Sequence, residues 1–351
     1  MILEDKKALL ACIGASVVTF NVRVRSVRPQ RKYSQAFRLI KAYIDAQHSE
    51  WIPVGTVKLL QIHPLKSGRR KEFFSIHCDA LGASFGEYRD REFMIIDGTT
   101  GQFLTARQLP KMILIESEIA DGVLTLSTPD GGSVQVVLAD VIASRDIKRT
   151  TLFDNLQADG IDCGEAVSKL ISGFLEQSDL RLVYYRPDLF NGRPCKPQPE
   201  WWNNPVPKRN DTVRFVDLAP FMITTEGSLK ALNDRLERPM RSANFRANIV
   251  VDQSEAWDED KWAAMRIGDV QLECFAPCTR CILPTVDPEK GVKDPDMQPL
   301  KKLREFRLAP EGKMRNAHGQ SPVFGVNAGI VKPGYVHIGQ TVYVKYKPSA
   351  F

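Results

Sequence analysis

Short apolar runs, separated by residues that favour turns, follow one another from about residue 54 to the end of the chain. Runs of this length, bounded by Gly, Pro, Asn and Asp, are typical of β-strands. The chain is therefore expected to be mostly β with a few helices, an α+β protein whose second half forms a barrel. The predicted strands cover residues 57–62, 93–96, 103–105, 123–127, 133–138, 180–185, 213–216, 248–251, 266–274 and 337–344.

Two β-hairpins and three helices complete this prediction. The turn residues Asp97-Gly-Thr-Thr-Gly101 separate one pair of strands, and Pro129-Asp-Gly-Gly132 separates another. Apolar residues recur at helical spacing in residues 30–49 and 164–176, and a capped helix is expected at residues 225–237. The chain shows neither alternating β–α–β units nor a glycine-rich nucleotide-binding motif, so the pattern does not favour a nucleotide-binding fold.

Residues 187–212 are rich in Pro, Asn and Gly and are the best candidate for a domain boundary. They separate a first domain of residues 54–186 from a second domain of residues 213–351. The segment contains two adjacent tryptophans, Trp201 and Trp202. Two interpretations stay open: the tryptophans are exposed and mark a contact surface, or they pack the loop onto the body of the protein.

The N-terminal residues differ in character from the rest of the chain. Between Lys6 and Ile44 there are nine Lys or Arg and no Asp or Glu, and the run at residues 8–20 is apolar. A helix needs about 20 apolar residues to span a bilayer, so this run is short. A membrane anchor, a secretory signal and a mitochondrial targeting segment are the competing hypotheses for residues 1–25, of which we favour the anchor. Residues 26–53 are expected to form a linker helix.

Composition and charge exclude some classes of partner. Hydrophobic residues make up 43% and charged residues 26% of the chain, as in an ordinary globular protein. The net charge is +6, but the basic N-terminal segment accounts for it, so a nucleic-acid partner is not supported. The seven cysteines are an odd number spread along the chain, which argues against a disulfide framework and for a reducing compartment.

The densest reactive chemistry lies in the segment Cys274-Phe-Ala-Pro-Cys278-Thr-Arg-Cys281. Thiolates are soft ligands that suit thiophilic metals, and Arg280 next to Cys281 is expected to favour the thiolate. The segment follows a predicted strand, so a loop at the strand end can present a ligand. The residues alone also allow half of a zinc or iron–sulfur site, with Cys195 or His318 as the fourth ligand.

Several short motifs occur in a fixed order along the chain. In the first half they are Val54-Gly-Thr-Val57, His63-Pro-Leu-Lys66-Ser67, Arg89-Asp-Arg91, Leu104-Thr-Ala-Arg-Gln108 and Asp162-Cys-Gly-Glu165. In the second half they include Asn244-Phe-Arg246-Ala-Asn248, Ile267-Gly-Asp-Val270, Pro277-Cys-Thr-Arg-Cys281 and Ser321-Pro-Val-Phe-Gly325. Each motif alone is a weak signal. As an ordered set they resemble the MOSC family, the molybdenum-cofactor-sulfurase C-terminal domain proteins, and within it the amidoxime-reducing components of animal mitochondria.

This resemblance implies an N-terminal β-barrel-like domain followed by a MOSC β-barrel domain. It also implies a molybdenum ion bound by molybdopterin, with Cys281 as its one protein ligand. Leu218 and Ala219 are apolar and offer backbone contacts only, and Asn327 stands where the animal proteins have a Tyr. Asp217 is the candidate proton donor. The residues expected to contact the cofactor are Lys66, Ser67, Arg91, Leu218, Ala219, Arg246, Asn248, Thr279, Arg280 and Asn327.

The resemblance further implies an enzyme that reduces N-hydroxylated compounds such as amidoximes, hydroxylamines and hydroxamic acids. Cytochrome b5 and its NADH-dependent reductase are the implied electron donors, and because cytochrome b5 is acidic, a basic docking face is expected. The implied location is the outer mitochondrial membrane, reached through the N-terminus, with the catalytic domain facing the cytosol. The alternative is a non-catalytic molybdenum-cofactor carrier or sulfur-handling protein.

Overall fold

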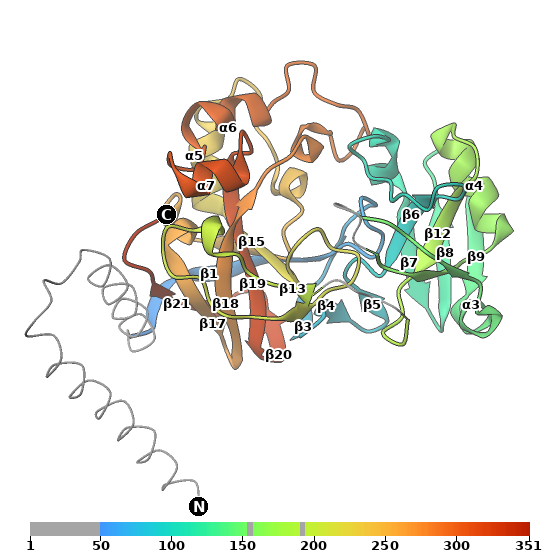
Figure 1. Ribbon diagram of the computed structural model, residues 1–351, viewed down its shortest axis with the longest axis horizontal. Helices are drawn as coiled ribbons and strands as arrows, with labels where there is room; N and C mark the ends of the chain where they lie inside the picture. Colours follow the sequence, from blue (N-terminus) through green and yellow to red (C-terminus); the bar gives the residue numbers. More distant parts are fainter. Residues whose placement is uncertain (1–49, 153–156, 190–193) are drawn as a thin grey trace, which may run out of the picture. The chain divides into compact units, whose positions relative to one another are not determined.

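The computed structural model describes residues 50–152, 157–189 and 194–351 (Figure 1). Residues from Ala46 to Phe351 form one compact unit. The predicted N-terminal segment 1–25, and residues 26–49 of the predicted linker helix, lie outside the described residues, and from Ile52 the chain is already strand. In the described ranges, no helix is both long enough and apolar enough to cross a membrane.

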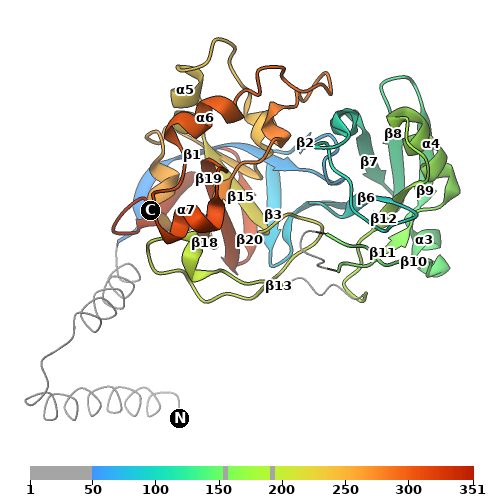
Figure 2. The same cartoon turned by 45° about the horizontal axis from the view of Figure 1, so that its top comes forward.

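Seven strands close into a β-barrel (Figures 1 and 2). The first strand, β1, pairs antiparallel with both β21 and β16, which joins the two ends of the sheet. Closure removes the free edges that an open sheet would expose. In order around the barrel, the strands are β1 (Ile52–Ile62), β21 (Thr341–Tyr346), β17 (Trp262–Ile267), β18 (Val270–Thr279), β19 (Val323–Lys332), β15 (Phe221–Thr225) and β16 (Ile249–Asp252), and β2 (Lys71–Glu72) pairs with the end of β1.

Strand β1 pairs with β21 through its first half and with β16 through its second half, and the two neighbours overlap at Thr56. Thr56 is paired with Thr341 of β21 on one side and with Asp252 of β16 on the other. Gly55 lies very close to the backbone of β16. A Cβ atom at position 55 would lie 2.0 Å from the Asp252 carbonyl oxygen. A side chain therefore does not fit, and glycine at position 55 is required for closure in this register.

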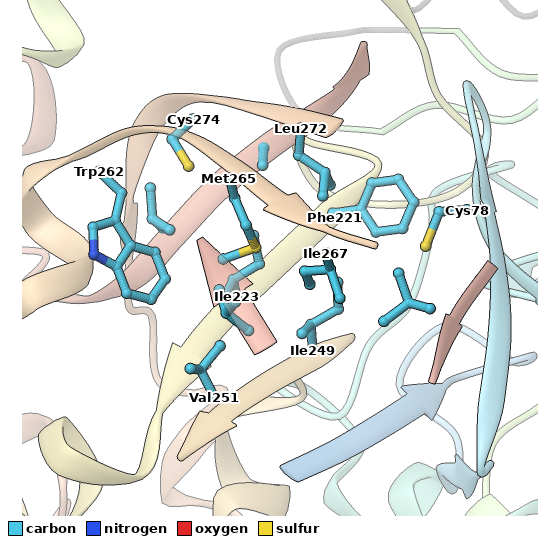
Figure 3. Close-up of a cluster of buried hydrophobic side chains, with 14 of the residues drawn as sticks. Cys78, Phe221, Ile223, Ile249, Val251, Trp262, Met265, Ile267, Leu272 and Cys274 are labelled. Atoms are coloured by element: carbon cyan, nitrogen blue, oxygen red, sulfur yellow. The ribbon is translucent and has the colours of Figure 1, made fainter. Parts of the chain in front are cut away.

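The barrel core is built from the inward-facing residues of its strands. Phe221 and Ile223 of β15 and Trp262 of β17 are fully buried there (Figure 3). Trp202 of the Pro-rich segment packs into the same core with 3% of its surface exposed, and Trp201 is half-buried. The tryptophan pair thus packs the loop onto the body, and the contact-surface interpretation is wrong.

Small sheets, two α-helices and one 3-10 helix make up the rest of the described first half. The hairpin predicted around Pro129–Gly132 and the helix predicted at residues 164–176 are confirmed. In the other predicted hairpin, the second arm is a single bridge between Phe103 and Ile96. One sheet contains β6 (Phe93–Asp97), β12 (Leu180–Tyr184), β11 (Gly160–Asp162) and β10 (Ile147–Lys148). A second sheet contains β7 (Glu116–Ala120), β8 (Val123–Ser127) and β9 (Ser133–Val137). The helices are η2 (Pro110–Leu114), α3 (Leu138–Ser144) and α4 (Glu165–Leu175).

The two halves of the chain exchange strands. Strand β1 precedes all other elements of the first half, yet it closes the barrel of the second half. In return, β20 of the second half extends the sheet of β3, where Val336 pairs with Ile76. Residues 54–186 and 213–351 therefore do not fold into two separate sets of sheets. This mixed sheet contains β20 (Gly334–His337), β3 (Ser75–Asp79), β4 (Gly82–Phe85) and β5 (Tyr88–Arg89).

The predicted strand at residues 213–216 is wrong. The segment between the halves contains the short elements β13 (Pro194–Cys195), η4 (Pro199–Trp201) and β14 (Asp211–Thr212), and the chain leaves strand geometry after Thr212. Phe215 is fully buried in this stretch, and its backbone N–H donates to the carbonyl of Arg91 at 3.2 Å. Packing against another loop has replaced pairing in a sheet, although the residue types favour a strand.

Two other predicted strands contain a turn. The run at residues 266–274 is divided by Gly268, whose φ of 55° is easy for glycine, into β17 and β18. The run at 337–344 is likewise divided into β20 and β21. Helix α5 begins after Thr225 as predicted but ends at Asn233. The remaining helices are α5 (Glu226–Asn233), η5 (Ser242–Phe245), η6 (Asp258–Lys261), η7 (Leu283–Thr285), α6 (Leu300–Phe306) and α7 (Lys313–His318).

A buried carboxyl group lies at the start of α5. Glu259 Oε2 accepts hydrogen bonds from Ser228 Oγ at 2.8 Å and from Thr225 Oγ1, the helix N-cap, at 3.1 Å. Its Oε1 has no hydrogen-bond partner among the described residues. Burial, and then the neighbouring Asp260 carboxylate, raise the pKa of Glu259 to about 7. The folded protein therefore binds a proton at Glu259 at pH values where the unfolded chain has released it.

This difference predicts a pH-dependent contribution to stability. Between about pH 4.5 and 7, each rise of one pH unit should lower the free energy of unfolding by up to about 1.4 kcal/mol through Glu259. The variant Glu259→Gln cannot ionise, so its stability relative to the natural protein should rise from pH 5 to pH 8. Urea unfolding at a series of pH values measures this, with the exposed Glu237→Gln as control. Parallel curves for the natural protein and Glu259→Gln would contradict the prediction.

Candidate functional site

One cavity of about 290 Å³ brings together all of the predicted site residues. It lies against the outer face of the barrel, where loops of the first half meet β15, β18 and β19. The predicted residues that line it are Lys66, Ser67, Arg91, Asp217, Leu218, Ala219, Arg246, Asn248, Thr279, Arg280, Cys281 and Asn327. The structure shows that these residues share one site, whereas their individual roles stay predictions.

Alternation along the strands explains which barrel residues reach the cavity. Phe221 and Ile223 of β15 point into the barrel core, so Met222 between them points outward and lines the cavity. In β19, Asn327 lies between two core residues and is likewise directed to the cavity. Its side-chain amide donates to the carbonyl of Pro277 in β18 at 3.1 Å, which fixes its orientation.

A bulge in β18 separates the cysteines. Cys274 pairs with Ala328, but Ala276 pairs with the adjacent Asn327, so β18 contains one extra residue between the two pairs. Such a bulge moves the following side chains to the other face of the sheet. Cys274 therefore lies in the barrel core, where burial raises the pKa of its thiol to about 12, and Cys278 lines the cavity.

Two thiols, rather than three, therefore reach the site. Cys281 follows the end of β18, and its Sγ accepts a hydrogen bond from Leu283 N at 3.5 Å. The residues proposed as a fourth metal ligand are elsewhere: Cys195 is buried in another cluster, and the His318 ring lies 3.0 Å from the Trp201 carbonyl. Among the described residues, no three His, Cys, Asp or Glu side chains are grouped to hold a metal ion.

The side chain of Arg280 donates hydrogen bonds to Cys278 and to the backbone of Phe245. It donates from Nη1 to Cys278 Sγ at 3.0 Å and from Nη2 to the carbonyl of Phe245 at 2.7 Å. The thiol that the guanidinium contacts is thus Cys278, although the sequence predicted an effect on Cys281. Arg280 Nε is buried without a hydrogen-bond partner in the described part of the chain.

An excess of positive charge is the main electrostatic feature of the cavity. Five cationic side chains line it, together with one carboxylate, Asp217. Arg246 is buried, and although its Nη1 donates to the carbonyl of Gly68 at 2.8 Å, its Nη2 has no partner among the described residues. Burial, and then the charge of Arg91, lower the pKa of Arg246 to about 9. A buried cation in this state is stabilised by an anion, so the cavity is built for an anionic ligand.

The backbone of the cavity is strained at three of these residues. Ser67, Arg91 and Arg246 have φ angles of 65°, 48° and 57°, in the left-handed region that side chains disfavour. Neighbouring hydrogen bonds hold them there, such as the one from Arg91 N to the His63 carbonyl at 2.7 Å. Strained backbone of this kind is concentrated at binding and catalytic sites, because the surrounding structure must enforce it.

A buried network positions Arg91. Its Nη1 donates to Asp90, and its Nη2 donates to the carbonyl of Arg246 at 3.0 Å. Although burial alone would raise the pKa of Asp90, Arg91 and hydrogen bonds from His63 hold it well below its usual range. Burial, with Arg91 and Arg246, lowers the pKa of His63, so its imidazole is neutral. The anionic Asp90 is therefore the group that orients Arg91 toward the cavity.

Asp217 and Lys66 form an ion pair at the edge of the cavity. Lys66 is buried and donates to Asp217 Oδ1 and, at 2.8 Å, to the carbonyl of Phe215. The Asp217 side chain is 54% exposed, so water reaches it. The carboxylate accepts from the lysine in this arrangement.

Sequence reasoning missed several lining residues. Thr105 and Arg107 line the cavity but were not predicted as site residues, although both lie within the motif Leu104–Gln108. Arg107 Nε donates to Thr105 Oγ1 at 3.0 Å. The motif itself was the signal that could have identified them. Phe245 and Leu283 form apolar walls, and no local pattern distinguishes them from core residues.

Comparison with known proteins agrees with this architecture. Residues 54–178 match the MOSC N-terminal beta barrel domain, and residues 210–343 match the MOSC domain. The chain belongs to the MOSC family. Among MOSC proteins it is similar to mitochondrial amidoxime-reducing component 1 of Mus musculus, with 34% identity over 83% of this chain and 82% of that protein.

Two further relatives cover similar lengths. Mitochondrial amidoxime-reducing component 1 of Danio rerio is 35% identical over 83% of this chain and 85% of its own length. Mitochondrial amidoxime reducing component 2 of Homo sapiens is 35% identical over 83% of this chain and 83% of its own. The similarity therefore extends over both domains of this MOSC protein.

The charge of the cavity predicts that a simple anion stabilises the ligand-free protein. Inorganic phosphate at ten times its dissociation constant should add about 1.4 kcal/mol to the free energy of unfolding, a rise in Tm of about 2–4 °C. The variant Arg246→Met should lose most of this rise, because it removes the buried guanidinium. Thermal unfolding with and without phosphate measures the effect, and the exposed Arg304→Met is the matched control. Equal rises in Arg246→Met and in the control would show that phosphate binds elsewhere.

Proposed function

We propose that this protein is a molybdenum-cofactor oxidoreductase that reduces N-hydroxylated compounds such as amidoximes, hydroxylamines and hydroxamic acids. The observation that carries the proposal is the cavity itself, in which the buried guanidinium groups of Arg246 and Arg280, each with one nitrogen that has no hydrogen-bond partner among the described residues, lie together with the thiol of Cys281. The names of the relatives, which describe amidoxime-reducing components, support the same reaction. Membership of the MOSC family supports the cofactor.

The residues of the cavity fit molybdopterin. The dithiolene of the pterin supplies two sulfur atoms to the metal, so one protein thiolate, Cys281, completes a soft ligand set. The phosphate of the cofactor needs cations and hydrogen-bond donors, which Lys66, Arg91 and Arg246 offer on one wall. Asn327 and Thr279 add polar groups for the pterin ring. When bound, the cofactor supplies the two-electron chemistry that breaks the N–O bond.

The protein groups orient the substrate and move protons. Reduction of an N–OH group takes up two electrons and two protons and releases water, so a proton source must lie at the cavity. We assign this role to Asp217, which is accessible to water and paired with Lys66. The apolar walls formed by Phe245, Met222 and Leu283 exclude water from the other side.

Electrons would reach this site from cytochrome b5 and its NADH-dependent reductase. The proposed location is the outer mitochondrial membrane, with the catalytic domain facing the cytosol and the N-terminal segment as the anchor. The names of the relatives, which describe mitochondrial components, support a mitochondrial location. The choice of the outer membrane, and the orientation of the catalytic domain toward the cytosol, rest on the resemblance of the sequence to the amidoxime-reducing components.

The test of the proposal compares the two thiols of the cavity. Cys281→Ser should lose bound molybdenum and the reduction of benzamidoxime, because a serine oxygen is a harder and weaker ligand. Cys278→Ser should keep a substantial part of both. Molybdenum and pterin content per chain, followed by an NADH-coupled assay with cytochrome b5 and its reductase, give the two readouts. If Cys278→Ser is the intolerant variant, the ligand assignment is wrong, and a cofactor-loaded protein without activity would favour the carrier role.

A second test concerns the anchor. Removal of residues 1–50 should release the protein from mitochondrial membranes and leave its molybdenum content unchanged, because β1 begins at Ile52. Trp51 is kept in this variant because its ring lies 5.1 Å from the Arg266 guanidinium and 5.1 Å from the Lys345 ammonium group. Carbonate extraction and metal analysis are the measurements. A truncated protein that still pellets with membranes would rule out the N-terminal segment as the anchor.

A further inference from the structure

Two adjacent hollows lie on the surface near the cavity, and Arg238 lines both. Their volumes are about 310 and 350 Å³. Each is lined by four cationic and two acidic side chains. We call this surface the basic double hollow. The first hollow lies between the chain around Arg238 and the loop from Asp287 to Pro295, and the second extends from Arg238 to the start of α6.

The acidic groups of the first hollow are already satisfied by their own loops. Asp287 Oδ1 accepts from the backbone N–H of Glu289 at 2.8 Å and of Lys290 at 3.1 Å. Asp294 accepts from two backbone N–H groups and from Arg238 at 3.1 Å. Lys290 and Lys293 are exposed, and neither forms an ion pair within the described residues. The charge available to a partner at this rim is therefore positive.

The loop that carries these lysines is well ordered by hydrogen bonds. Asp287 N donates to the Val292 carbonyl at 2.8 Å, and Gly291 N donates to the Asp287 carbonyl at 2.9 Å. Asp294 N donates to the Thr285 carbonyl at 2.7 Å. The lysines are thus presented from a fixed backbone, which lowers the entropy lost when a partner binds.

Only one wall separates the first hollow from the cavity. Asn244 lines the hollow, and the next residues, Phe245 and Arg246, line the cavity. The side-chain amide of Asn244 donates to the carbonyls of Pro284 at 3.1 Å and Val286 at 3.3 Å, so it links the segment 244–246 to the segment 284–286. A protein seated on the double hollow would lie directly over this wall.

The local charge does not reflect a basic protein body. Residues 50–351 contain 39 Lys or Arg and 39 Asp or Glu, so the body is neutral and the excess of +6 lies in residues 1–49. A positive rim on a neutral body steers a negatively charged partner to one place. The carboxylates of Asp294 and Asp296 among the cations favour a protein, with charges at fixed positions, over a uniformly anionic membrane surface.

We infer that the basic double hollow is the docking surface for an acidic electron-carrier protein, whose carboxylates contact Lys290 and Lys293. This inference rests on the proposed function, which requires electrons from another protein. Docking at this surface places the carrier over the shared wall and leaves the Asp217 side of the cavity open. Substrate can then enter while the carrier is bound.

The test uses charge reversal in the full-length, cofactor-loaded protein. The double variant Lys290→Glu/Lys293→Glu should raise the KM for reduced cytochrome b5 by about tenfold or more at low ionic strength, and added salt should shrink the difference. Its rate with a small reductant such as reduced methyl viologen should not change. The matched control, Lys169→Glu/Lys196→Glu, reverses two exposed lysines elsewhere and should leave both rates unaltered.

Each outcome separates the docking surface from the reaction itself. Equal KM values in the double variant and the control would overturn the inference, while activity with methyl viologen would still support the proposed function. Loss of binding to phosphatidylserine vesicles without a change in KM would assign the hollow to a membrane and also overturn it. Lys290→Gln/Lys293→Gln removes the charge without reversing it and should give an intermediate KM, which guards against an effect of misfolding.

Discussion

Closure of the barrel by β1 is the constraint on which the rest of the structure depends. The strand has neighbours on both edges, and Gly55 allows the backbone of Asp252 to approach it closely. Directly after β1, the chain enters the loop that carries Lys66 and Ser67, and Lys66 N donates to the Phe93 carbonyl at 2.8 Å. The cavity wall contributed by the first half is thus placed by a strand that belongs to the barrel of the second half.

Two costs to stability meet in the cavity. A buried guanidinium nitrogen without a hydrogen-bond partner, and backbone in the left-handed region, each lower the stability of the folded chain. Both occur at Arg246, and Arg91 reaches the same place only because the buried Asp90 carboxylate holds it. Other buried groups carry such costs too: Glu259 Oε1 has no hydrogen-bond partner among the described residues, whereas Arg307 is paired with Asp260 at 2.7 Å. What distinguishes the cavity is that three left-handed residues and the partly unsatisfied guanidinium groups of Arg246 and Arg280 line one site.

Most of the residues that line the cavity could be named from the sequence because they lie in or beside the ordered motifs that resemble the MOSC family. The orientation of the cysteines could not, because the extra residue in β18 leaves no mark in the pattern of apolar positions. Cys274 and Cys278 would share one face of a regular strand, and only the bulge separates them. The exchange of β1 and β20 was also missed, since local patterns identify strands but not their partners. At Phe215, burial by a neighbouring loop overrode a strand-like sequence.

The buried Nη2 of Arg246, which has no hydrogen-bond partner among the described residues, has a consequence for the protein in a cell. An anion that neutralises it binds the folded chain in preference to the unfolded chain, and it stabilises the fold in proportion to the logarithm of its free concentration. Changes of one or two kcal/mol alter the fraction of unfolded chain that proteases can degrade. Binding of such an anion would couple the abundance of the protein to the supply of its ligand, so that chains made faster than the ligand is delivered would be removed first.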